Sequence, residues 1–441
     1  MTHAALAIAS PPTPSGGRRS AFETARVRAL ALLLENPFLE AGQVRSALEE
    51  LTPSELRAFG YDSYYMNALM LFGATHGAER VHRIAAAATR AKLLNGWEAE
   101  ARYGALRRGF EDARRQGRPE SLAIAPALEG WEAVSLPRIP SGVGYILALF
   151  HLPGYRYTGT DLAFAGHTTR IPMMEEARER ISIRYFAGFP DEFHARCRLL
   201  SVEQRGATFT LAKALRKGEL VTMFADGNLG ADGSWDTTAR TKVRFLNEEL
   251  YVKNGIPRLA IVTGAPVVPV ITRRRAGGGY DVSALPTLVP PERSAAEAGN
   301  AYVATVMQTL YGALAAEVER TPAEWESLCH IHRWRIARAP QAGPDSMADR
   351  VLAGEEDSWR VRFDTSRVAD LSSGADLLFV DVQTMSGVRP PSAAEPLFRA
   401  LGQHDGVTSR WLDQHADSVD RRAALLAALG TLSRRGLLMR L

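Results

Sequence analysis

A histidine stands at the end of an apolar run near the middle of the chain. Residues 144–150 read GYILALF, His151 follows them, and Pro153-Gly154 breaks the segment. Parallel strands of α/β folds deliver functional groups at their carboxyl ends, and a neutral imidazole there can take a proton from an attacking hydroxyl or amine. We therefore predict that His151 is a general base. The alternative is a histidine at a strand end that only hydrogen-bonds to the backbone.

A glycine-rich turn supplies the second group of candidates. Residues 215–233, LRKGELVTMFADGNLGADG, predict the end of a helix, a short strand and a turn that contains Asp226, Asn228 and Gly230. Glycines let backbone N–H groups approach a phosphate or an oxyanion, and Asp226 could orient a base or bind an acceptor. An ordinary strand-to-loop turn uses the same residue types.

Two further stretches carry cations and histidines. Residues 259–280, LAIVTGAPVVPVITRRRAGGGY, predict a helix and a buried strand followed by the arginines 273–275, which could clamp a phosphate or be solvated. Residues 321–335, TPAEWESLCHIHRWR, contain Trp325, His330, His332 and Arg333. Two histidines at strand-like spacing beside one cysteine are a weak zinc signal, so we predict no metal. The sequence also lacks a P-loop, a G-x-S-x-G elbow and a zinc deaminase pattern.

Short apolar runs alternate with helical segments around these candidates. The runs are VGYILALFH, RISIRYF, ELVTMFADG, RLAIVTGAPVVPVITRR and YDVSAL, and the helical segments include TFTLAKALRKG and NAYVATVMQTLYGALAAEVER. This alternation predicts an α/β domain over residues 119–335 with a mixed, mostly parallel sheet flanked by helices. Its strands would bring the candidate residues to one edge of the sheet.

The rest of the chain divides by composition. We predict a flexible tail over residues 1–19, a helical region over 20–118, a linker over 336–354 and a small α+β, winged-helix-like domain over 355–441. The last domain is predicted from the strand-like SWRVRFD and LLFVDVQT, followed by three amphipathic helices. The helical region carries many arginines between 102 and 118, which could meet phosphates or form a solvated face balanced by acidic residues.

Composition narrows the class of protein. The chain has 441 residues, a formal net charge of +4 and two cysteines, which excludes a disulfide scaffold and suits a reducing cytoplasm. Because no apolar run approaches the roughly 18–20 residues of a membrane span, we expect a soluble, cytoplasmic protein without an integral membrane span.

The order of the four candidate stretches resembles the lysophospholipid acyltransferase superfamily, and within it the lipid A lauroyl/myristoyl acyltransferases. The matching stretches are FHLPGYR, LRKGELVTMFADGNLG, NGIPRLAIVTGAPVVPVITRR and TPAEWESLCHIHRW, within about residues 130–335. The resemblance implies transfer of an activated acyl group from a thioester of acyl carrier protein or coenzyme A, with no bound cofactor. The acceptor would be a hydroxyl or amine of a soluble molecule in a specialised biosynthetic pathway.

The resemblance also implies roles for residues of this chain. His151 would be the general base, and Asp226 with its turn, including Asn228 and Gly230, would position the acceptor or the base. Arg274 and Arg333, with His332 beside them, would hold the donor phosphate or the oxyanion.

One position departs from the family pattern. The family carries Asp or Glu five residues after its histidine, where this chain has Arg156. An arginine disfavours the imidazolium that the family carboxylate stabilises, although it could contact substrate. We expect either that Asp161 or Asp226 replaces the missing carboxylate in space, or that His151 has lost the usual role.

Three alternatives follow from the remaining features. Residues 355–441 resemble a PqqD-like peptide-recognition domain, and such modules bind a peptide or carrier by adding a strand to a sheet edge. Otherwise they form a generic winged helix used for dimerisation or as a lid. On the same fold the donor could be an aminoacyl-tRNA, held by the arginine-rich helix. The chain could also be a catalytically inactive binding protein.

Overall fold

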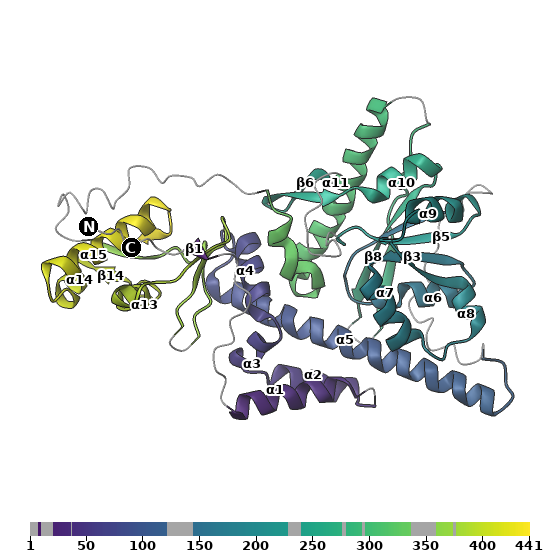
Figure 1. The fold of residues 1–441 in the computed structure, drawn as a ribbon, viewed down its shortest axis with the longest axis horizontal. Helices are drawn as coiled ribbons and strands as arrows, with labels where there is room; N and C mark the ends of the chain where they lie inside the picture. The colour runs from purple at the N-terminus through teal and green to yellow at the C-terminus, as the bar shows by residue number, and fades with distance from the viewer. Residues whose placement is uncertain are drawn as a thin grey trace. The chain divides into compact units, whose positions relative to one another are not determined.

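The computed structural model describes residues 8–9, 21–36, 38–120, 144–227, 240–275, 279–292, 296–336, 359–373 and 376–441 (Figure 1). The chain forms two compact units, each of which contains segments that are far apart in the sequence. Unit 1 comprises Met1–Thr24, Gly60–Ala86 and Leu328–Leu441, and unit 2 comprises Ala25–Phe59 and Ala87–Ser327. The predicted domain boundaries stay a prediction, and the predicted linker lies largely outside the described residues.

A six-stranded sheet forms the centre of unit 2, with the strand order β4-β3-β5-β2-β8-β9. The strands are β2 (Ile146–Leu149), β3 (Thr169–Met173), β4 (Cys197–Ser201), β5 (Leu220–Phe224), β8 (Val267–Arg274) and β9 (Tyr280–Ala284). The neighbours pair in parallel, except that β9 pairs antiparallel with β8. All four residues of β2 are buried, as expected for a central parallel strand covered on both faces. The predicted α/β fold class is therefore confirmed.

Helices cover both faces of this sheet (Figure 1). They are α6 (Thr158–Phe164), α7 (Glu175–Ile181), α8 (Asp191–Arg196), α9 (Ala207–Arg216), α10 (Gly255–Thr263) and α11 (Ala296–Arg320). A 3₁₀ turn, η3 (Tyr155–Tyr157), precedes α6. In the figure α9 and α10 lie on the opposite side of the strands from α6 and α8.

One predicted strand is wrong. Residues 180–186, RISIRYF, continue the helix α7 into a π-helix, η4 (Ser182–Phe186). Ile183 is 74% exposed, so the alternating apolar residues of this run do not form one buried face of a strand. The helix-favouring residues that precede them, EEARER, set the conformation instead.

Two antiparallel strands were not predicted from the sequence, and the first of them packs on α11. These are β6 (Arg240–Phe245) and β7 (Glu248–Lys253). Leu246 in the connecting turn has φ 52°, a left-handed conformation that non-glycine residues seldom adopt. On β6 and β7, buried and more exposed side chains alternate, as in a sheet with one wet face.

Helices also occupy the predicted helical region. They are α1 (Ala21–Leu34), α2 (Ala41–Glu49), α3 (Pro53–Ala58), α4 (Tyr61–Phe72) and the long α5 (Ala78–Arg115). A capping box starts α3, because Thr52 and Glu55 satisfy each other's backbone N–H groups. Within unit 2, α5 binds the preceding helices through Arg90, which donates to the carbonyl of Leu48, and Trp97, which donates to that of Asn36.

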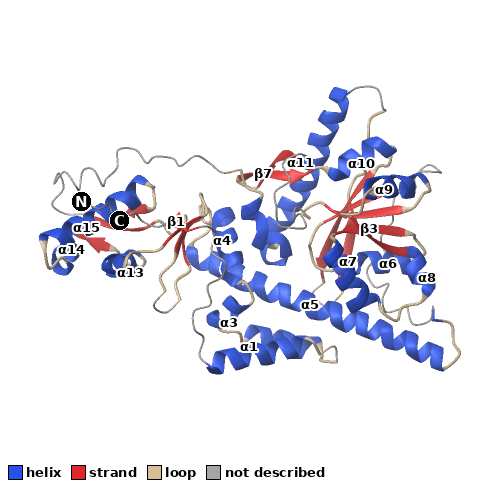
Figure 2. Cartoon of the chain, in the orientation of Figure 1, coloured by secondary structure: helices blue, strands red, loops and turns tan. Residues whose placement is uncertain are grey.

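Among its described residues, the C-terminal part of unit 1 contains two small antiparallel sheets and three α-helices. Figure 2 shows its helices in blue and its strands in red. One sheet has the order β1-β13-β12-β11 and the other β14-β10-β15. The strands are β1 (Ile8–Ala9), β10 (Arg360–Phe363), β11 (Val368–Asp370), β12 (Phe379–Asp381), β13 (Ser386–Val388), β14 (Val407–Thr408) and β15 (Leu438–Arg440), and the helices are α13 (Glu395–Leu401), α14 (Ser409–His415) and α15 (Val419–Arg434). Phe363, Phe379 and Phe398 contact one another in their shared core.

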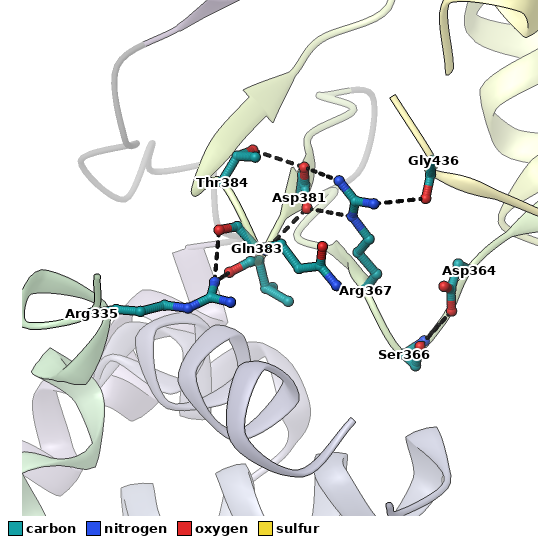
Figure 3. A network of polar contacts seen from close by, with 9 residues as sticks. Arg335, Asp364, Ser366, Arg367, Asp381, Gln383, Thr384 and Gly436 are labelled. Carbon is teal, nitrogen blue, oxygen red and sulfur yellow. Dashed lines mark hydrogen bonds and ion pairs between the residues drawn. The ribbon is translucent and has the colours of Figure 1, made fainter. Parts of the chain in front are cut away.

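A buried ion pair lies between these strands (Figure 3). Arg367 donates two hydrogen bonds to Asp381, of 2.9 and 3.0 Å, and a third to the carbonyl of Gly436. The backbone N–H of Gln383 and the hydroxyl of Thr384 also donate to Asp381. Arg335 donates to the carbonyls of Val382 and Gln383 and so joins the start of this part to its sheet.

No helix among the described residues is long and apolar enough to cross a membrane.

Candidate active site

The register of two adjacent strands brings His151 and Asp226 together. Strands β2 and β5 pair in parallel with Leu149 opposite Phe224, and each side chain of interest follows two residues later. The backbone N–H of Ala225 donates to the carbonyl of Leu149 and extends the pairing beyond the strands. Both residues therefore emerge at the same carboxyl edge of the sheet, where α/β folds bind ligands.

The carboxylate of Asp226 is enclosed and fully hydrogen-bonded. Its Oδ1 lies 2.8 Å from Nδ1 of His151, and its Oδ2 accepts from the indole N–H of Trp325 at 2.8 Å. The backbone N–H of His151 also donates to the two oxygens, at 3.2 and 3.1 Å. The Asp226 side chain is 0% exposed, so these donors replace the water that it loses.

The imidazole of His151 is held in one orientation and reaches solvent. A carboxylate only accepts hydrogen bonds, so Nδ1 carries a proton, and Nε2 of the neutral ring has its lone pair available. The ring stacks on Phe224, 4.8 Å between centroids, and meets Tyr155 edge-on at 4.7 Å. Its side chain is 25% exposed, and no described residue hydrogen-bonds to Nε2. The free nitrogen of a fixed imidazole is the geometry that a general base needs.

The two groups stabilise each other's charged forms. Burial lowers the pKa of His151, but the charge of Asp226 and the hydrogen bond to it outweigh burial, so that this pKa is raised above 6.5. Burial raises the pKa of Asp226, but the charge of His151 and the hydrogen bonds from His151 and Trp325 outweigh burial and lower that pKa. Asp226 therefore remains a carboxylate, while His151 titrates.

A second carboxylate faces the residue that departs from the family pattern. Nη2 of Arg156 lies 2.6 Å from Oε1 of Glu326. The Arg156 guanidinium also lies over the ring of Tyr155, 4.8 Å from its centroid. Arg156 therefore does not stand beside His151 as an unbalanced positive charge.

Asp161 lies elsewhere in unit 2. Its Oδ1 accepts from Arg102 at 2.7 Å, and its side chain is 1% exposed. Burial raises the pKa of Asp161 to about 7, although Arg102 acts in the opposite direction. Of the two predicted replacements for the family acid, the structure brings Asp226 to His151 and pairs Asp161 with Arg102.

The three arginines at the carboxyl end of β8, of which Arg273 and Arg274 are its last two residues, have partners inside unit 2. Arg273 pairs with Glu317 and Arg275 with Asp281. Arg274 pairs with Glu98 and donates to Asn95 at 2.5 Å. The role predicted for Arg274 in holding a donor phosphate stays a prediction, and it would require that these contacts open.

The predicted site residues His332 and Arg333 lie in unit 1. The HIH segment forms a 3₁₀ helix, η6 (Glu326–Arg333), not a strand. Nδ1 of His332 lies 3.1 Å from the Asn67 side chain, and burial lowers the pKa of His332 to about 4. Arg333 is exposed. Asn228 and Gly230 lie outside the described residues. No three His, Cys, Asp or Glu residues of the described ranges are grouped as metal ligands would be.

Sequence reasoning assigned no role to two residues that complete the site, although it named Trp325 as a candidate. Trp325 binds the carboxylate of Asp226, and Glu326 pairs with Arg156. Both belong to the TPAEWESLCHIHRW stretch that carries the family resemblance, and the stretch itself was the available signal. Their contacts were out of reach because 99 residues separate Trp325 from Asp226, and 170 separate Glu326 from Arg156.

Comparison with protein families supports this reading. Residues 196–335 match the family model for bacterial lipid A biosynthesis acyltransferase, which confirms the predicted resemblance over this stretch and supports an acyltransferase. The matched stretch contains Asp226, Trp325 and Glu326, whereas His151 precedes it. No curated protein matches the chain significantly.

Proposed function

We propose that the protein transfers an acyl group from a thioester of acyl carrier protein or coenzyme A to a hydroxyl or amine of a soluble acceptor. The observation that carries this proposal is the His151–Asp226 pair, whose imidazole reaches solvent with Nε2 available, within a chain that matches an acyltransferase family. No metal or bound cofactor is required, because a thioester is already activated for attack.

The geometry supports one sequence of proton movements. Nε2 of His151 takes the proton of the acceptor hydroxyl or amine as its oxygen or nitrogen attacks the thioester carbonyl carbon. The Asp226 carboxylate stabilises the imidazolium that forms. As the carbon–sulfur bond breaks, the imidazolium returns the proton to the leaving sulfur. The products are the acylated acceptor and a free thiol.

The turn that follows Asp226, with Asn228 and Gly230, is proposed to position the acceptor or the developing oxyanion. Its support is the sequence, since these residues directly follow a carboxylate of the site. Backbone N–H groups in glycine-rich turns are suited to bind an oxyanion.

The C-terminal part of unit 1 is proposed to bind a peptide or carrier that bears the acceptor. The support is an edge of its sheet. Strand β13 pairs antiparallel with β1, with Val388 opposite Ile8 and Gly387 opposite Ala9, so this edge accepts a short extended segment. Adding a strand in this way is a general mode of peptide recognition.

The test is intact-mass detection of acyl loss from a panel of donors, namely acyl carrier protein thioesters, coenzyme A thioesters and aminoacyl-tRNA. His151→Ala should lower turnover about 10³-fold or more, because general base catalysis contributes about 10²–10⁴-fold. His167→Ala is the matched control, since this exposed histidine precedes β3 in the same unit. No transfer from any thioester would overturn the proposal. Transfer from aminoacyl-tRNA alone, abolished by ribonuclease, would replace the proposed donor.

A further inference from the structure

The segment Trp325-Glu326 contacts both members of the proposed dyad. The indole of Trp325 donates to Oδ2 of Asp226. The backbone N–H of Glu326 donates to the carbonyl of His151 at 2.9 Å. This dipeptide therefore holds the carboxylate of Asp226 through a side chain and the backbone of His151 through its main chain.

The Arg156–Glu326 ion pair ties this segment to the loop that follows His151. Arg156 lies in η3, five residues after His151, and its guanidinium bonds to Glu326 at 2.6 Å. The two side chains are 28% and 15% exposed, so the pair is partly shielded from solvent. A charge-assisted bond in this environment is stronger and better ordered than a surface ion pair.

The charged and titratable groups that act on His151 come from three parts of the chain. Asp226 follows β5, Glu326 begins η6, and Tyr155 and Arg156 lie in η3. Arg156 alone would disfavour the imidazolium that forms in the reaction, and Glu326 alone would favour it. Paired, their opposite charges largely cancel at the imidazole.

We propose that Arg156 and Glu326 are positioning residues, which cancel each other's charge beside His151 and hold Trp325 against Asp226. The inference rests on the proposed function of the dyad. It explains how Arg156 is accommodated where the resembled family carries an acid, because Glu326, from a distant part of the chain, balances its charge.

The test is the ionisation of His151, followed by NMR of the imidazole in the full chain. Glu326→Gln removes the negative charge and leaves Arg156, so the pKa of His151 should fall by about 0.5 to 1. Arg156→Gln leaves Glu326, so the same pKa should rise by a similar amount. The double variant should return to within about 0.3 of the wild-type value, because both opposing charges are gone. Glu192→Gln, which breaks the exposed Arg196–Glu192 pair, is the matched control and should leave the value unchanged.

The positioning role has its own readout. The double variant should keep the wild-type pH profile but lose about tenfold in kcat, because the tie that holds Trp325 is absent. The single variant Arg156→Lys, which retains the charge and the pair with Glu326, should lose less kcat than the double variant. Shifts in the same direction for the two single variants, or no shift in either, would overturn the proposal. Its failure is distinct from that of the proposed function, since the titration of His151 needs no turnover, whereas the proposed function fails when the wild type transfers no acyl group.

Discussion

Asp226 in unit 2 and Asp381 in unit 1 are both buried aspartates at the carboxyl ends of strands, and both accept several hydrogen bonds. The Asp226 and Asp381 side chains are 0% and 1% exposed. Their partners differ. Arg367, the partner of Asp381, is 7% exposed and donates its hydrogen bonds to Asp381 and to the carbonyl of Gly436. His151, the partner of Asp226, is 25% exposed, and no described residue hydrogen-bonds to its Nε2.

The difference shows that a buried carboxylate alone does not mark a catalytic site. Hydrogen bonds and the charge of the partner lower the pKa of Asp226 and of Asp381, although burial acts in the opposite direction on each. Arginine stays protonated at every relevant pH, so its pair with Asp381 can only hold the fold together. Histidine exchanges a proton near neutral pH, so its pair with Asp226 can do chemistry. The partner's ionisation and access decide the role.

The largest expected effect separates the two aspartates by activity. Asp226→Asn should lower kcat about 10⁴-fold, because the amide neither fixes the imidazole tautomer nor stabilises the imidazolium. Asp381→Asn should cause no comparable loss. Release of free thiol from a thioester donor measures both, and circular dichroism checks folding. A loss below tenfold for Asp226→Asn would break the comparison.

The next effect separates them by stability. Asp381→Ala leaves Arg367 buried without its carboxylate and should lower the free energy of unfolding of unit 1 by about 3–5 kcal/mol. Urea unfolding measures the change. Replacing both partners, with Arg367→Met and Asp381→Leu together, should cost much less, since no uncompensated charge remains. Equal costs for the single and the double variant would contradict the structural role assigned to this pair.

A smaller effect tests the indole that serves the catalytic carboxylate. Trp325→Phe keeps most of the packing against Phe245 but removes the donor to Asp226. Losing a hydrogen bond to a charged group costs about 1.5–3 kcal/mol, and we expect a loss of roughly tenfold to 100-fold in kcat. Tyr311→Phe, which removes a donor to the carbonyl of Ala225, is the control and should affect kcat less. A larger loss in Tyr311→Phe than in Trp325→Phe would show that the hydrogen bond to the Ala225 carbonyl matters more than the indole contact.

The mildest test uses pH alone. The raised pKa of His151 means that kcat/KM should rise about tenfold per pH unit until the pH passes a value above 6.5, and then level off. The contribution of the His151–Asp226 pair to stability changes with pH in the opposite direction to kcat/KM. It is fully present below pH 6.5 and is lost as the pH rises through the raised pKa of His151. The contribution of Asp381 should stay constant above about pH 5 and disappear only in acid, because its pKa is lowered. A kcat/KM that is flat from pH 5 to 8 would count against His151 as the base.

The sequence predicted the parts of the site but not their assembly. Apolar runs of the expected length identified β2 and β5, and each was followed by a side chain that could do chemistry. That β5 lies beside β2 depends on the tertiary fold and cannot be read from a local pattern. The sequence therefore could not predict the 2.8 Å contact of His151 with Asp226, nor that Asp226 and not Asp161 would make it. The sequence left open whether Arg156 costs His151 its usual role, because its partner, Glu326, lies 170 residues away.

Failures in the fold have equally local causes. Residues 180–186 alternate in the way a strand does, but the preceding charged residues had already begun a helix, and Ile183 remains exposed. The hairpin of β6 and β7 was not predicted, because its strands carry several charged residues. Neither segment contributes a side chain to the dyad, so these errors left the predicted site intact.

The register between β2 and β5 makes the dyad a matter of counting. Two residues separate Leu149 from His151, and two separate Phe224 from Asp226. Removing one residue from either interval would draw that side chain back by about 3.3 Å and turn it to the other face of the sheet. In a chimera or a circularly permuted version of this protein, these two short intervals are the lengths that must be inherited unchanged.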